Sequence, residues 1–215
     1  MSAALSALDI SDAAESWAAL GFEIPEGSVW LDGVELRLER PGHGIVGWSL
    51  AGIDPVAEID GLATEVAGSE PGAEASHQNG AIGLDHVVVV TPDFDRTASA
   101  LAGAGLELRR VREVPNAGIR QGFRRLGPAI LELVEARDVP AGPARFWGLV
   151  VVVRDLDSLA ERLGELLGQI KPAAQPGRRI ATLRSSAGLT PAVAFMDPEA
   201  QPTSSAKRGS SRTVA

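Results

Sequence analysis

The chain has 215 residues and no cysteine, and its 28 acidic residues outnumber 20 basic ones, which gives a net charge of −8. The lack of cysteine excludes disulfides, thiolate metal sites and cysteine nucleophiles. An acidic chain without a basic stripe is repelled by phosphate backbones, so we expect no nucleic-acid partner. The sequence has neither a signal-peptide pattern nor an apolar run long enough to span a membrane, which predicts a cytoplasmic protein.

The N-terminal region, residues 1–67, carries weak signals of a small α+β unit. Residues 12–20 predict a helix, and residues 45–51 predict a closing strand. Between them Asp32-Gly33 predicts a hairpin, because this dipeptide suits a type I′ turn. We interpret the region as a degenerate copy of the module described next. The polar, turn-forming stretch 68–81 that follows predicts a linker.

The first full module is predicted over residues 82–138. The β-branched run 86–91 is typical of a strand that is buried on both faces. Asp93 and Asp95 are suited to cap the helix that follows. Three further strands fit residues 107–113, 119–126 and 129–135. The predicted order is therefore β-α-β-β-β.

The same order returns over residues 145–197. The phrases VVVVTPDFD and VVVVRDLD make the duplication visible, and Asp155 takes the place of the first module's cap. The expected strands are residues 149–153, 168–171, 179–184 and 192–196. A repeat of about 60 residues fits a duplicated module rather than a solenoid unit. Residues 198–215 have no apolar period and predict a disordered tail.

These residues resemble the vicinal oxygen chelate superfamily, the glyoxalase and bleomycin-resistance type. The resemblance rests on the strand opening GLDH at 83–86, the helix start PDFD at 92–95, the strand ILEL at 130–133 and the second copy of the module. It implies an α+β fold in which paired βαβββ modules form a cup around one site. It also implies a homodimer. Many members hold a divalent metal for isomerisation, epimerisation, ring cleavage or thiol transfer, and others bind a drug or metabolite without metal.

Carried over to this chain, the resemblance makes His86 and Glu132 the metal ligands of the first module. Imidazole with carboxylate suits Zn, Fe, Mn or Ni ions equally. In the second module the histidine position falls on Gly148 or Leu149, and the glutamate position falls on Ala194. Half of the four-ligand set is missing, and catalytic sites usually keep three protein ligands. We therefore expect a metal site that is degenerate or absent.

Each candidate residue also has a plainer interpretation. Trp147 is either a stacking surface for a planar ligand or a core residue. Glu132 is either a ligand or a structural carboxylate paired with Arg124 or Arg109. His86 is either a ligand or a buried strand-end histidine. The remaining ligand contacts that we expect, alongside His86 and Trp147, are Gln121 and Arg124.

The sequence favours a small-molecule-binding protein with its ligand in the cup, against His86, Glu132 and Trp147. The alternative is a divalent-metal-dependent lyase, isomerase or dioxygenase, in which His86 and Glu132 hold the ion and Glu132 is the catalytic carboxylate. A third possibility is a structural module that mediates protein assembly. Stoichiometric metal would favour the enzyme, and stabilisation by metabolites but not metals would favour the binding protein.

Overall fold

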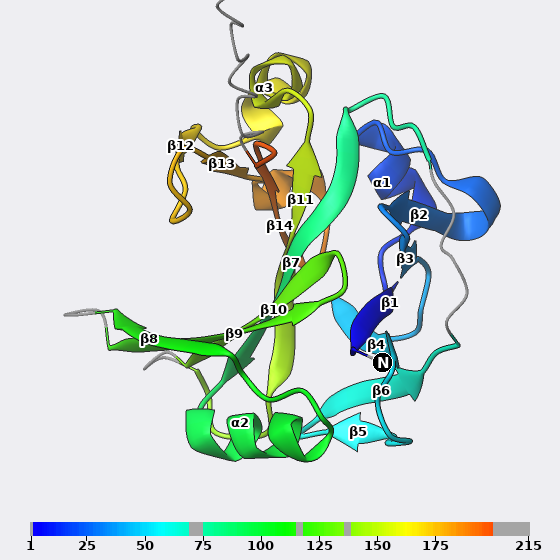
Figure 1. Ribbon diagram of the computed structural model, residues 1–215. Coiled ribbons are helices and arrows are strands. Elements are labelled where there is room, and N and C mark those ends of the chain that lie inside the picture. The colour runs from blue at the N-terminus through cyan, green and yellow to red at the C-terminus, as the bar shows by residue number, and fades with distance from the viewer. Residues whose placement is uncertain (1, 69–74, 115–117, 136–138, 200–215) are drawn as a thin grey trace, which may run out of the picture.

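The computed structural model describes residues 2–68, 75–114, 118–135 and 139–199 (Figure 1). Residues 69–74 of the predicted linker and almost all of the predicted disordered tail lie outside these residues. Two β-sheets make up the structure, one of six strands and one of eight. In Figure 1 the smaller sheet, from the N-terminal region, lies beside β7 of the larger sheet, and the outer strands of the larger sheet extend away from it.

The larger sheet has the order β12-β13-β14-β11-β7-β10-β9-β8. Its strands are β7 (Ala81–Thr91), β8 (Arg110–Val114), β9 (Ile119–Leu126), β10 (Ala129–Glu135), β11 (Arg145–Val153), β12 (Lys171–Pro172), β13 (Arg179–Thr182) and β14 (Ala192–Met196). The first strands of the two modules, β7 and β11, pair antiparallel at the centre. Each also pairs in parallel with the last strand of its own module, β10 or β14. The predicted fold of paired βαβββ modules is confirmed.

The helices of the two modules begin at the predicted aspartates. Asp93 accepts a hydrogen bond from the Arg96 backbone N–H at the start of α2 (Phe94–Gly103). Asp155 does the same for Ser158 at the start of α3 (Leu156–Leu163), because a side-chain oxygen satisfies a free N–H of the first turn. Short 3-10 turns, η2 (Gly164–Leu166) and η3 (Ser185–Ala187), follow in the second module. No helix in the described part of the chain is long and apolar enough to cross a membrane.

The N-terminal sheet has the order β2-β3-β1-β4-β6-β5. Its elements are β1 (Ala4–Ile10), α1 (Ala14–Ala19), η1 (Pro25–Gly27), β2 (Ser28–Leu31), β3 (Val34–Arg37), β4 (Ile45–Ala51), β5 (Glu58–Ile59) and β6 (Leu62–Val66). The predicted hairpin joins β2 to β3, and both Asp32 and Gly33 have the positive φ angles of a type I′ turn. The predicted helix over 12–20 is the shorter α1.

The strand predicted to close this region, residues 45–51, has a different place. The hairpin places β3 parallel to β1, so β3 has the position beside β1 that β10 has beside β7. The strand β4 instead runs antiparallel to β1 and pairs in parallel with β6. This arrangement matches β11 beside β7, with β14 as its parallel partner. The strand order β3-β1-β4-β6 thus parallels the order β10-β7-β11-β14 of the larger sheet, and that the region is a degenerate copy of the modules stays a prediction.

The two sheets share one hydrophobic core, which includes Leu8, Trp48, Val87, Val89 and Leu149. Because side chains alternate along a strand, His86, Val88 and Val90 of β7 point to the opposite side of the larger sheet. The N-terminal region thus covers one face of the large sheet and leaves the other face free for a site.

The described end of the predicted linker is anchored to the N-terminal sheet. His77 is only 5% exposed. Its Nδ1 accepts a hydrogen bond from the Glu23 backbone N–H at 3.0 Å, so its Nε2 carries the proton and donates to the Trp30 carbonyl at 2.8 Å. Asn79 donates to the Leu20 carbonyl at 3.1 Å. The stretch after residue 74 is therefore a packed part of the structure.

Candidate functional site

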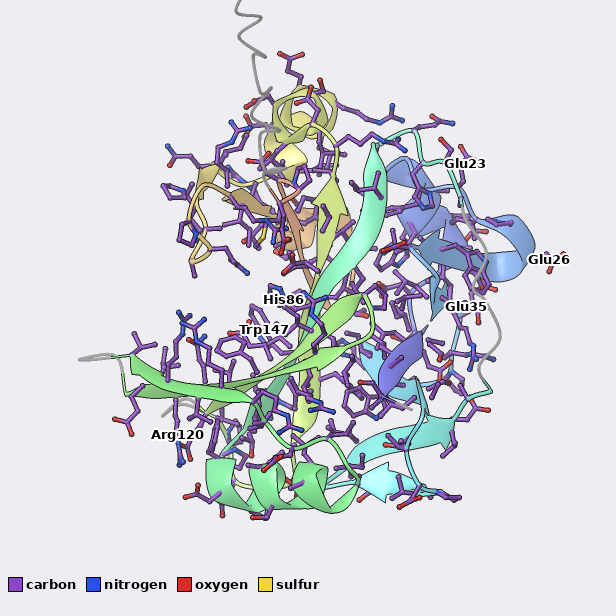
Figure 2. All side chains as sticks on the ribbon, viewed as in Figure 1. Glu23, Glu26, Glu35, His86, Arg120 and Trp147 are labelled. Carbon is purple, nitrogen blue, oxygen red and sulfur yellow. The ribbon has the colours of Figure 1, made fainter. Side chains whose placement is uncertain are left out.

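A cavity of about 530 Å³ lies on the free face of the large sheet, and both modules line it. We call this cavity the cup. Its walls are mostly apolar, with Val88, Val90, Val134, Val150, Ile180 and Ala194 among the lining residues. A few polar groups interrupt them, as in most small-molecule sites: His86, Gln121, Glu132, Lys171 and Thr182. In Figure 2 His86 and Trp147 lie near the middle of the sheet, on the side away from the N-terminal sheet.

The His86 ring lies between two carboxylates. Its Nδ1 is 2.7 Å from Asp85 Oδ2, and its Nε2 is 3.3 Å from Glu132 Oε2. Adjacent strand residues normally point to opposite faces, but the register against β11 skips Asp85, pairing Val150 with His86 and Val151 with Leu84. This irregularity leaves Asp85 unpaired in the ladder and explains how its side chain reaches the ring of its neighbour.

Asp85 is held by a second buried charge. Its Oδ1 is 2.5 Å from Nη1 of Arg178, whose side chain is 6% exposed. The Arg178 Nε–H also donates to the Asp197 carbonyl. Burial opposes ionisation, but the hydrogen bonds from His86 and Arg178 hold the pKa of Asp85 below its ordinary value. Asp85 is therefore a carboxylate at neutral pH, and its acceptor oxygen fixes the proton on Nδ1 of His86.

Glu132, the second carboxylate beside His86, has a different environment from Asp85. Its Oε1 accepts a hydrogen bond of 2.6 Å from the Gln121 amide, whose own oxygen accepts one of 2.6 Å from Arg112. Burial raises the pKa of Glu132, although the charges of His86 and Arg112 oppose the shift. A carboxyl group with a raised pKa in a cleft is a candidate for proton transfer.

The structure separates the predicted arginines from this carboxylate. Arg124 lies opposite Leu131 on β10, so its side chain is on the core side of the sheet and not in the cup. Its Nε is buried without a hydrogen-bond partner among the described residues. Arg109 pairs with exposed Glu107. The predicted pairing of Glu132 with Arg124 or Arg109 is wrong, and the cation that Gln121 links to Glu132 is Arg112, which was not among the predicted residues.

Gln121 and Trp147 both line the cup. Gln121 lies three residues from Arg124, so the period of two along a strand places the two on opposite faces. Trp147 is 55% exposed, which rules out a core role. A register irregularity between Phe146 and Gly148 turns Trp147 outward, while the Phe146 ring packs 5.3 Å from that of Trp48. The indole face is free to contact a ligand.

The donor set does not fit a catalytic divalent metal. His86 and Glu132 supply two ligands, and in the part of the chain that the structure describes no third His, Cys, Asp or Glu joins them. A Cβ on Gly148 would overlap the carbonyl oxygen of Ala192, so no histidine fits there. The second module presents Val150 and Ala194 to the cup, and these two residues pack with buried Met196 in an apolar cluster. Catalytic metal sites usually have three protein ligands.

Two βαβββ modules in one sheet, with a cup that both of them line, define the vicinal oxygen chelate fold. Similar solved structures include a methylmalonyl-CoA epimerase from Mycobacterium tuberculosis, with a TM-score of 0.48, 20% identity, 57% of this chain covered and 92% of that chain. A hypothetical protein from Bacillus halodurans has a TM-score of 0.45 and 18% identity, with 55% of this chain and 96% of that chain covered.

A methylmalonyl-CoA epimerase from Streptomyces coelicolor, solved with 2-nitronate-propionyl-CoA, has a TM-score of 0.44 and 19% identity, with 54% and 97% of the chains covered. At this level of identity the likeness concerns the fold alone. No protein-family model matches the sequence, and no curated protein matches it.

Proposed function

We propose that the cup binds a small organic molecule without the help of a divalent metal. The observation that carries this proposal is the pair of polar groups, buried His86 and largely buried Glu132, on the floor of an apolar cavity of about 530 Å³. The valine walls suit an apolar ligand body. Glu132 keeps acceptor capacity that a ligand hydroxyl, amide or amine satisfies, since an unsatisfied buried carboxylate is costly.

A second candidate function, proton-transfer catalysis, follows from the contact between His86 Nε2 and Glu132 Oε2. Asp85 fixes a proton on Nδ1 of His86, so a neutral ring presents a lone pair at Nε2. Nε2 of His86 and Oε2 of Glu132 are 3.3 Å apart, which is close enough for the two groups to share a proton. A bound substrate would meet this proton at the cup floor. An isomerase or lyase that works by acid–base chemistry would use Glu132, with Asp85 orienting His86.

The metal-dependent lyase, isomerase or dioxygenase is the alternative that elemental analysis tests. We would measure retained metal after dialysis against Zn, Fe, Mn and Ni ions, in the wild type, His86→Ala and Glu132→Ala. His43→Ala and Glu161→Ala are matched controls, because both residues are exposed and lie away from the cup floor. We expect clearly less than one equivalent in every variant. One equivalent that is lost only in the two cup variants would overturn the metal-free proposal.

Ligand binding is tested by thermal stabilisation with a panel of metabolites. Compounds that raise the melting temperature of the wild type should lose their effect in Glu132→Gln and keep it in Glu161→Gln. Stabilisation by no metabolite and no metal, together with self-association, would support the structural-module alternative instead. The homodimer and the cytoplasmic location stay predictions, and analytical ultracentrifugation tests the first of them.

A further inference from the structure

A second cavity, of about 550 Å³, lies where the N-terminal region meets the second module. We call it the interface cavity. Its lining includes His43, Ile45, Arg145, Trp147, Arg184 and Thr190. Four residues also line the cup: Arg145, Trp147, Ala192 and Val193. The two cavities therefore adjoin, with Trp147 at their border.

The interface cavity is basic in an acidic chain. His43, Arg145 and Arg184 line it, and its lining contains no Asp or Glu. Arg145 is exposed and makes no salt bridge to the carboxylates of the described residues. Among the carboxylates of the described residues, Arg184 reaches only Glu165, at 4.0 Å, and Glu165 is almost fully exposed. Two guanidinium groups that are free to turn into one cavity suit a phosphate, sulfonate or carboxylate.

The wall of this cavity is held in place before any ligand arrives. Buried Asp12 accepts hydrogen bonds from the backbone N–H and the hydroxyl of Thr190, and a third from the indole of Trp17. The Gly44 backbone N–H donates to the Thr190 hydroxyl oxygen at 3.0 Å. These bonds join the N-terminal region to the loop before β14. A wall fixed in this way loses little entropy when a ligand binds.

We propose that the interface cavity binds the anionic group of a ligand whose planar or aromatic part lies on Trp147. Arg145 and Arg184 neutralise the anion, and the exposed indole face offers the stacking surface. The inference rests on the proposed function in one respect, because it makes the same ligand continue past Trp147 into the cup. The ligand class is thus an organic anion with a flat segment and an apolar end.

Collisional quenching of tryptophan fluorescence tests the basic character of the cavity without any ligand. Trp17 and Trp48 are fully buried and Trp30 is only partly exposed, so Trp147, at 55% exposed, is the tryptophan most open to a quencher. We expect iodide to quench more strongly than caesium, despite the net charge of −8. Arg145→Gln with Arg184→Gln should lower iodide quenching by roughly twofold. Arg110→Gln with Arg154→Gln removes the same charge from exposed positions outside both cavities and should leave it unchanged.

Calorimetry with 2-naphthalenesulfonate and 2-naphthol, which share one ring system, tests the ligand class. We expect the wild type to bind the sulfonate about tenfold more tightly. The variant with both Arg145→Gln and Arg184→Gln should lose this preference and keep its affinity for 2-naphthol. Thr182→Phe narrows the cup from an exposed position on β13 and should weaken both compounds without changing iodide quenching.

The outcomes separate the two proposals. A sulfonate preference or an iodide effect that survives removal of both arginine charges overturns the anion site. Equal affinity of the wild type for the two compounds overturns it as well. If Thr182→Phe changes neither affinity while the arginine variant still loses the sulfonate preference, the anion site stands and the proposed function of the cup fails.

Discussion

Glu132 reaches His86 from the adjacent parallel strand although the two residues are not paired across the ladder. The register places Ile130 beside His86 and Val88 beside Glu132. Both side chains point to the cup, because residues two apart along a strand share a face. The offset brings Oε2 to 3.3 Å from Nε2, with neither group displaced from the sheet. One face of two neighbouring strands thus supplies the pair of His86 and Glu132 at the floor of the cup.

Because burial raises the pKa of Glu132, ionisation of this carboxyl group is predicted to lower the free energy of unfolding as the pH rises. A carboxyl group whose pKa is raised in the folded protein stabilises it most below its unfolded pKa of about 4.5, and this stability is lost as the pH rises through the folded pKa. Glu132→Gln removes the buried charge. At pH 7 we expect this variant to be more stable than the wild type by about 1 kcal/mol, and the difference should vanish near pH 4.

Urea unfolding at several pH values checks this prediction. Glu161→Gln, at an exposed position of α3, should show no such pH trend. A Glu132→Gln protein that is less stable than the wild type at pH 7 would mean that the ionised carboxylate is a net stabiliser, held by His86 and Gln121.

The pair of Asp85 and Arg178 predicts the opposite pH dependence, in which stability is lost as the pH falls. Because the pKa of Asp85 is lowered, its contribution is present above its unfolded pKa of about 3.8 and is lost as the pH falls through the folded value. Asp85→Asn leaves the Arg178 guanidinium buried without its carboxylate. We expect a loss of about 3 kcal/mol in the free energy of unfolding at pH 7.

A double-mutant cycle measures the interaction. Arg178→Met in the Asp85→Asn background should restore part of the lost stability, since the unpaired charge is gone. Additive losses from the two substitutions would show that the pair contributes nothing beyond its separate residues.

Gly148 lies where β11 and β14 leave no room for a side chain. A Cβ there would overlap the Ala192 carbonyl, so Gly148→Ala should cost about 2 kcal/mol by forcing β11 and β14 apart. Gly103→Ala is the control, because nothing lies within 4 Å of its Cβ position at the end of α2. Chemical denaturation should show the first variant destabilised and the second unchanged or more stable. Equal stabilities would mean that the strands have room for a side chain.

The regular parts of both modules were predictable from the sequence, and the irregular parts were not. The strands over 119–126, 129–135 and 192–196 have the predicted bounds, because turn residues and apolar patterns mark their ends. Asp85 and Trp147 lie at register irregularities of β7 and β11. One extra residue in a strand reverses which side chains face the site, and no pattern in the sequence marks where that residue is.

The strand pairing of the N-terminal region was not predictable for a related reason. The strand at 45–51 was correctly expected, but its partner depends on which strand the hairpin at Asp32-Gly33 had already placed beside β1. Pairing is a property of the assembled sheet, and apolar patterns report only on the strand itself.

Trp147 supplies a prediction that separates binding from stability. Its side chain is more than half exposed, so Trp147→Ala should change the free energy of unfolding by no more than about 0.5 kcal/mol. The neighbouring Phe146→Ala removes a ring that packs on Trp48 and should cost about 3 kcal/mol. Aromatic compounds that stabilise the wild type should bind Trp147→Ala at least about fivefold more weakly, because the stacking contact is worth about 1 kcal/mol. Calorimetry gives the affinities and urea unfolding gives the stabilities. Unchanged affinity with unchanged stability would remove Trp147 from the site, and the border between the two cavities would then have no role in recognition.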